Sequence, residues 1–147
     1  MPLQTVIEQV AGILHRNEVP FQTRADGNGY RMLHDSTAIF VTFAEYGETV
    51  MVSVHSPVLQ QIDESVGLCD ILTAVNELNA NARFARFVYY GEEHVIAVEY
   101  DLAGDDLQES ELLLAVQRIT HAANTKDEEL QLRLGTGLRF SDTLPEV

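Results

Sequence analysis

The sequence predicts one α+β domain with an antiparallel sheet, and three observations support that fold class. The chain has 147 residues, which suits a single domain. Three segments repeat apolar residues at helical spacing, and short β-prone runs lie grouped between them. Strands grouped in this way are typical of an α+β fold. We therefore expect the order α-β-β-β-α-β-β-α, with a sheet of about five strands and all helices packed on one face.

The three helices are predicted from apolar stripes. The first ends near Asn17, because Pro20 disfavours helical geometry in the residue before it. The second is closed by Asn79 and Asn81. The third begins after Asp106, which can cap it, and ends at about Asn124. In chain order, the stripe residues are Val6, Ile7, Val10, Ile13, Leu14, Leu68, Ile71, Leu72, Val75, Leu78, Leu112, Leu113, Val116, Ile119 and Thr120.

The strands are predicted from runs rich in β-branched and aromatic residues. The run 38–43 is the most β-prone in the chain. Turns are expected at 26–29, where Gly and Asn tolerate positive φ, and around Gly91. The other expected strand segments are 21–24, which is short, 30–33, 50–55, 84–90 and 95–100.

Residues 125–147 are predicted to form a tail beyond a domain that spans 1–124. A charge run at 126–129 leads into Leu130, Leu132 and Leu134, which alternate with polar residues. A period of two fits a strand added to a sheet edge, of this chain or of a neighbour. The alternative is a disordered tail.

The charge of the chain limits its partners. The formal net charge is −14 and Lys126 is the one lysine, so clustered cations for nucleic acid or an anionic membrane are missing. A basic segment of another protein would be attracted, although the charge also simply favours solubility. The sequence shows no secretion signal and no apolar run of the ~20 residues that a membrane span needs. We expect a cytoplasmic protein.

No motif in the sequence predicts catalysis. The five histidines show no metal-binding pair spacing, and the single cysteine, Cys69, falls in an apolar helical pattern. Neither a nucleophile elbow nor a phosphate-binding loop is found. We therefore expect no catalytic residues, no metal site and no cofactor, and we predict that the protein is not an enzyme.

One face of the predicted sheet is unusual. Residues of one parity, such as Val41, Val52 and Val98, are apolar and should face the helices. The other parity mixes apolar and polar residues, whereas a face open to water is normally polar. A half-apolar face is typical of a protein- or peptide-binding surface. The alternative is that the tail or a second subunit covers it. The expected binding residues are Phe40, Met51, His55, Arg86, Val88, Tyr90 and Val95.

Several segments also carry a family resemblance. They are Asn76-Glu77-Leu78-Asn79, Arg83-Phe84-Ala85-Arg86-Phe87, Val98-Glu99-Tyr100-Asp101-Leu102 and a helix that opens after Leu107. With the order of elements, they resemble the YbjN-like family of bacterial domains, which is related in fold to type III secretion chaperones. The resemblance covers about residues 3 to 124 and consists of strand and helix junctions.

The resemblance implies a one-domain α+β fold, often dimeric, that binds a peptide or protein and has no known chemistry. With the mixed sheet face and the acidic charge, it leads us to expect a non-catalytic, chaperone-like or regulatory binding module that self-associates as a homodimer. Two alternatives remain open. One is a structural homodimer without a further ligand, and the other is a small domain that binds a ligand of unknown identity.

Overall fold

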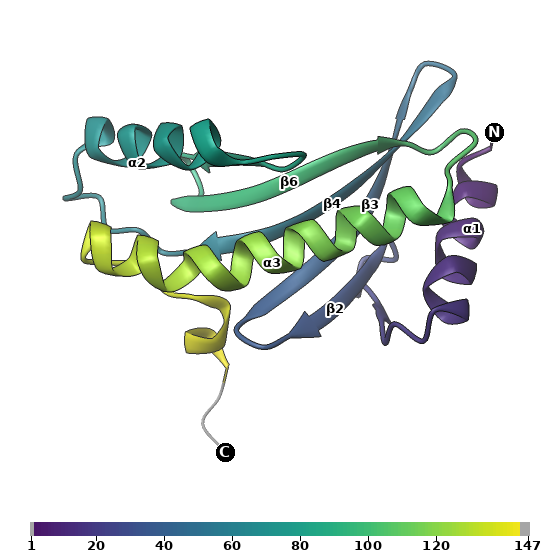
Figure 1. Ribbon diagram of the computed structural model, residues 1–147, viewed down its shortest axis with the longest axis horizontal. Helices are drawn as coiled ribbons and strands as arrows, with labels where there is room; N and C mark the ends of the chain where they lie inside the picture. The colour runs from purple at the N-terminus through teal and green to yellow at the C-terminus, as the bar shows by residue number, and fades with distance from the viewer. Residues whose placement is uncertain (1, 145–147) are drawn as a thin grey trace.

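The computed structural model describes residues 2–144 and contains a six-stranded antiparallel sheet with three helices (Figure 1). The helices are α1 (Leu3–Arg16), α2 (Leu68–Asn81) and α3 (Glu109–Leu134), and a short 3₁₀ helix, η1 (Phe140–Thr143), follows them. The strands are β1 (Gln22–Thr23), β2 (Tyr30–His34), β3 (Thr37–Tyr46), β4 (Thr49–Leu59), β5 (Arg86–Tyr90) and β6 (Val95–Ala103).

The strands lie in the order β1-β2-β3-β4-β6-β5, and every neighbouring pair is antiparallel. After β4 the chain passes through α2 to the sheet edge, and β6 then returns to lie between β5 and β4. The α+β class and the predicted order of elements are confirmed. The sheet has six strands where about five were expected, and the two-residue β1 lies within the short strand segment expected at 21–24.

All three helices pack on one face of the sheet and share one core with it. Helix α3 lies along the sheet and contacts β3, β4 and β6, while α1 contacts β3 and α2 contacts β5 (Figure 1). The strand residues expected to face the helices, such as Val41, Val52 and Val98, are fully buried. The predicted parity is therefore the observed one.

Helix α3 does not end at about Asn124, where the sequence predicted its end, but continues to Leu134. The predicted strand at Leu130–Leu134 is therefore wrong. Leu130 lies seven residues after the buried Ala123, so it returns to the buried stripe, and Leu132 points outward. The sequence pattern did not indicate that the helix continues, because a charged residue, Asp127, occupies a position of the buried stripe. There Asp127 accepts a hydrogen bond from the Ser36 hydroxyl.

The segment after α3 is also ordered as far as position 144. Gly135 ends the helix in the left-handed conformation, with φ of 71°, which glycine adopts without steric cost. Leu138 then forms a β-bridge with Gln60, and the Ser141 N–H donates to the carbonyl of Ser36. A disordered tail is therefore also wrong for 125–144. Positions 145–147 of the expected tail lie outside the described residues.

Strand β4 is longer than the predicted 50–55, because it continues through Pro57 to Leu59. Its pairing with β3 ends at His55, so the missing N–H of Pro57 removes no bond from that ladder. Pairing with β6 continues to Leu59 through an irregularity in the register.

The outer edge of β5 is closed by a side chain of α2. Phe87 is buried in the middle of β5. Its N–H donates to the carboxamide oxygen of Asn79 at 2.7 Å, and its carbonyl accepts from the Asn79 amide at 2.9 Å. Open strand edges are templates for pairing with another chain. Asn79 therefore occupies the backbone groups that a strand added beside β5 would use at this position.

The helical path of α3 past position 124 can be tested with two alanine substitutions. Leu130 is 2% exposed and Leu132 is 75% exposed, whereas a strand would place both side chains on one face. We expect Leu130→Ala to lower the free energy of unfolding by about 2–5 kcal/mol. Leu132→Ala should change it by less than about 0.5 kcal/mol. Urea unfolding measures both, and equal losses would contradict the helical assignment.

Candidate functional site

The face of the sheet opposite the helices, called the outer face below, carries one row of side chains across all six strands. Residues paired across neighbouring strands project to the same face. The pairing joins Gln22 to Arg31, then Phe40, His55, Glu99 and Arg86. This central row brings cationic, aromatic and acidic groups together from segments that are far apart in the sequence.

The predicted site residues all lie on the outer face, but not all lie together. Phe40, His55 and Arg86 belong to the central row. Val88 pairs with Ala97, and Tyr90 pairs with Val95, so these residues form two apolar rows beside it. Met51 lies apart from this cluster, paired with Ala44 and Ala103. The role of these residues in binding stays a prediction.

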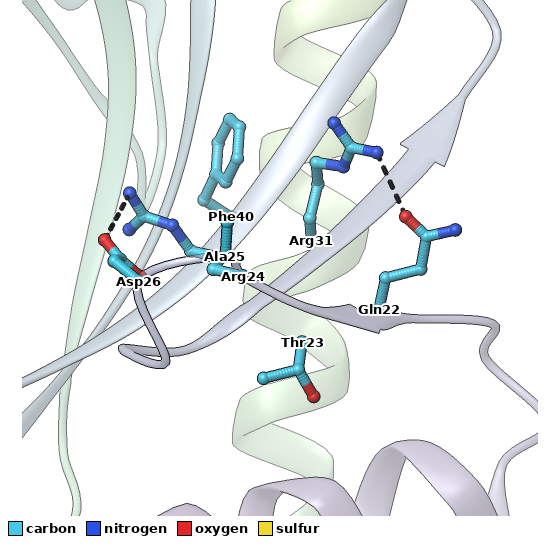
Figure 2. Close-up of a pocket in the computed structure, with 7 residues that line it drawn as sticks. All are labelled: Gln22, Thr23, Arg24, Ala25, Asp26, Arg31 and Phe40. Atoms are coloured by element: carbon cyan, nitrogen blue, oxygen red, sulfur yellow. Dashed lines mark hydrogen bonds and ion pairs between the residues drawn. The ribbon is translucent and has the colours of Figure 1, made fainter.

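Two adjoining cavities hollow the outer face. The sheet cavity, of about 420 Å³, is lined by Arg24, Phe40, His55, Pro57, Tyr90, Glu93, Val95, Ala97 and Glu99. The arginine cavity, of about 460 Å³, is lined by Gln22, Thr23, Arg24, Ala25, Asp26, Arg31 and Phe40 (Figure 2). Because Arg24 and Phe40 line both, they form the boundary between the two cavities.

Arg24 is placed over the sheet by the loop that joins β1 to β2. The Arg24 N–H donates to the carbonyl of Gly29 at 2.9 Å, which closes the loop. Gly29 has φ of 110°, and a Cβ there would lie 2.0 Å from the carbonyl oxygen of Val41, so the loop can approach β3 only with glycine. As a result, the Arg24 guanidinium lies 5.4 Å from the centre of the Phe40 ring, within the range of a cation–π contact.

Arg24 and Arg31 were not among the predicted site residues. Arg24 belongs to a loop, where strand parity offers little guidance. Arg31 did carry a signal, since it alternates in β2 with Tyr30 and Met32, which are both buried in the core. Parity applied to that strand would have placed Arg31 on the outer face.

The acidic groups of the central region are held by local partners. Glu99, whose side chain is 14% exposed, pairs with Arg86 at 3.1 Å and accepts a hydrogen bond from the Tyr90 hydroxyl. Asp101 pairs with the same guanidinium at 2.6 Å. Burial and the hydrogen bond to Glu99 raise the pKa of Tyr90 to about 12. At neutral pH, Tyr90 is therefore a neutral phenol that is hydrogen-bonded to Glu99, and it lines the sheet cavity.

His55 contributes an uncharged ring at neutral pH. Burial lowers its pKa below the ordinary value of 6.5, against the opposite effect of the Glu99 carboxylate and with a further lowering from Arg24. The imidazole stacks on Phe40, with ring centres 5.7 Å apart and an angle of 24° between the planes. Both of these stacked rings line the sheet cavity.

Among residues 2–144, no group of three or more His, Cys, Asp or Glu side chains is arranged to hold a metal ion. Within the same residues, no helix combines the length and apolar character needed to cross a membrane.

The fold and the outer face define a class of protein: an antiparallel sheet covered by helices on one side and hollowed on the other. A family model described as type III secretion system (YopN, CesT) and YbjN peptide-binding chaperone 1, TY-Chap1, matches residues 3–143. The chain belongs to this family, so the resemblance to YbjN-like domains is confirmed. The match also continues past position 124, where the resemblance seen in the sequence ended.

Solved structures show the same fold at low sequence identity. A chain of the ExsC–ExsE complex is 10% identical with a TM-score of 0.56, and the alignment covers 86% of this chain and 93% of that chain. A chain of the HopA1–SchA chaperone–effector complex is 11% identical with a TM-score of 0.57, covering 87% and 98%. YbjN from E. coli is 8% identical with a TM-score of 0.58, covering 84% and 92%. No curated protein matches the sequence.

The environment of His55 can be tested by following its imidazole resonances with pH. We expect a pKa below 6.5, because burial disfavours the charged ring. In Glu99→Gln the pKa should fall further, since the carboxylate that raises it is gone. A His55 pKa at or above 6.5 in the wild type would contradict the described packing.

The lowered pKa of His55 also determines how the stability of the fold changes with pH. Between the folded-state pKa and 6.5, the unfolded chain binds the proton more readily than the folded chain. The contribution of His55 to stability is therefore lost as the pH falls from above 6.5 through the folded-state pKa.

Proposed function

We propose that this protein is a non-catalytic, chaperone-like module that holds a peptide segment of another protein on the outer face of its sheet. The observation that carries the proposal is the pair of adjoining cavities on that face. The sheet cavity presents apolar surface from Phe40, Val95 and Tyr90, and hydrogen-bonding groups at Glu99 and His55 lie beside it. An apolar centre with polar groups at its rim is the common composition of a protein interface.

The comparisons support a peptide as the ligand. The family is described as peptide-binding, and two structures of similar fold are complexes, one of them a chaperone with an effector. The geometry of this chain supports one mode of binding. Asn79 occupies the backbone groups of Phe87 at the β5 edge, so we place the peptide on the face of the sheet, where side chains rather than backbone groups make the contacts.

Self-association is proposed as a second property, at a different surface. Leu68 and Leu72 lie one turn apart on α2 and are 59% and 48% exposed. A pair of exposed leucines on one helix face is suited to contact with a second copy. Because α2 lies on the opposite side of the sheet from the outer face, a homodimer formed there would leave the peptide site open.

The remaining expectations from the sequence stay proposals. The net charge of −14 would attract a partner that is basic overall, before individual side chains of the two proteins come into contact. A cytoplasmic location and a bacterial origin are proposed on the sequence and on the family resemblance.

Substitutions on the outer face test the site. We expect Phe40→Asp or Tyr90→Asp to weaken peptide binding by tenfold or more, which is about 1.4 kcal/mol, because each places a carboxylate in the apolar part of the sheet cavity. The ligand is a peptide selected on the wild-type protein from a displayed random library, and fluorescence anisotropy measures its affinity.

Phe84→Asp is the matched control. Phe84 is exposed and, like Phe40, lies under an arginine, here Arg118, but it stacks on Tyr100 beside α3. We expect it to bind the peptide with wild-type affinity. Circular dichroism shows whether each variant is folded. If folded Phe40→Asp and Tyr90→Asp bind as well as the wild type, the outer face is not the site.

A further inference from the structure

The arginine cavity holds two guanidinium groups on either side of one aromatic ring. Arg31 in β2 is the direct cross-strand neighbour of Phe40, and Arg24 lies over the same ring from the β1–β2 loop. Figure 2 shows the Phe40 ring between the two arginine side chains. This arrangement concentrates positive charge in a protein whose net charge is −14.

The two arginines differ in how well their charges are matched within the molecule. Arg24 forms an ion pair with Asp26 at 3.2 Å, and both side chains are open to solvent. Arg31 donates a hydrogen bond to the neutral carboxamide oxygen of Gln22 at 3.0 Å. Among the described residues, no carboxylate lies within ion-pair distance of Arg31. The cavity therefore contains two arginines and one acid, and the charge of Arg31 has a neutral partner.

We propose that the arginine cavity binds a carboxylate side chain of the peptide, beside a large apolar residue that fills the sheet cavity. This inference rests on the proposed function and names the kind of peptide: a segment with Asp or Glu two positions from an aromatic or long aliphatic residue. Arg24 and Phe40 line both cavities. Side chains two positions apart in an extended peptide project to the same side, roughly 7 Å apart along the chain, and can therefore enter the two cavities together.

Hydrogen-bond chemistry favours a peptide carboxylate over the Gln22 carboxamide as the partner of Arg31. A guanidinium makes shorter and stronger hydrogen bonds to a carboxylate than to an amide, and its planar donors fit two carboxylate oxygens at once. On binding, the carboxylate replaces the Gln22 oxygen on Arg31, and the freed carboxamide returns to solvent. The apolar residue contacts the Phe40 ring and the stems of the arginines, which fixes the position of the acid.

The acidic surroundings do not cancel this attraction. Interactions between exposed charges fall off over about 8 Å at physiological ionic strength, so the direct contact with Arg31 outweighs the distant acids. Nearer the site, Glu99 is paired with Arg86 and bonded to Tyr90. The carboxylates that face the two cavities are Asp26, Glu93 and Glu99. They would favour a basic peptide instead, which is the competing outcome.

The experiment is a selection from a displayed library of random peptides on three full-length proteins: wild type, Arg31→Gln and Arg118→Gln. Arg118 is the matched control, because it also lies over a phenylalanine, Phe84, but beside α3. We expect the wild type and Arg118→Gln to enrich Asp or Glu two positions from a large apolar residue. Arg31→Gln should keep the apolar residue and lose the acidic enrichment.

A selected peptide then provides the quantitative test. Replacing its acidic residue with the matching amide should weaken binding to the wild type about tenfold and to Arg31→Gln less than twofold, as fluorescence anisotropy measures. This coupling is the readout that a purely structural role of Arg31 would not produce, and unfolding in urea confirms that the variant is folded.

The outcomes separate this inference from the proposed function. Apolar enrichment without acidic residues, or with basic ones, overturns the inference and leaves the peptide-binding function standing. A wild-type protein that selects no peptide removes the proposed function, and the inference falls with it. If instead the wild type sediments as a dimer that Phe40→Asp dissociates, a second copy occupies the face and the inference is overturned.

Discussion

The packing of α3 along the middle of the sheet is the interaction on which the rest of the structure depends. Its buried residues alternate between large and small, with Leu112, Ile119 and Leu130 among Ala115 and Ala123, so the helix lies close to the strands over its length. Burying a leucine or isoleucine contributes roughly 1.5–3 kcal/mol relative to exposing it. The helix thereby packs across β3, β4 and β6 and covers the central part of the inner face.

The outer face follows from this constraint. With α3 in the centre and α1 and α2 beside it, the helices use a single face, and the sheet itself presents the other. Two local features then shape that surface. Gly29 lets the β1–β2 loop approach β3 and carry Arg24 over Phe40. The Asn79 carboxamide occupies the edge-facing N–H and carbonyl of Phe87 in β5, which disfavours pairing of this edge with another strand.

The main parts of this arrangement could be predicted from the sequence, because strands alternate strictly between faces. Once Val41, Val52 and Phe87 were assigned to the core, Phe40, His55 and Arg86 had to lie opposite. The end of α3 could not be predicted from the spacing of its apolar residues. Leu130 and Leu134 are four residues apart, so they fit both a helix and an alternating strand, and Asp127 looked like part of a solvated run. Its burial depends on Ser36, which is 91 residues away in the chain.

The site was predicted less completely for a similar reason. Parity places side chains on a face but does not show which of them meet around a cavity. Met51 has the correct parity and yet lies apart from the cavities. Arg24 lines both, although its position depends on a loop contact with Val41. The pairing of Glu99 and Asp101 with one arginine likewise depends on how β5 aligns with β6.

The central claim, that a peptide lies on the outer face, is tested most directly by a spin label. A library-selected peptide carrying a nitroxide is added to isotopically labelled protein, and paramagnetic broadening of each backbone amide is measured by NMR. The account predicts the strongest broadening at Phe40, His55 and Ala97, with weaker broadening at Arg118 and Leu132 on α3, which lies behind the sheet. Broadening centred on Arg118 and Phe84, with the outer face unchanged, would contradict it.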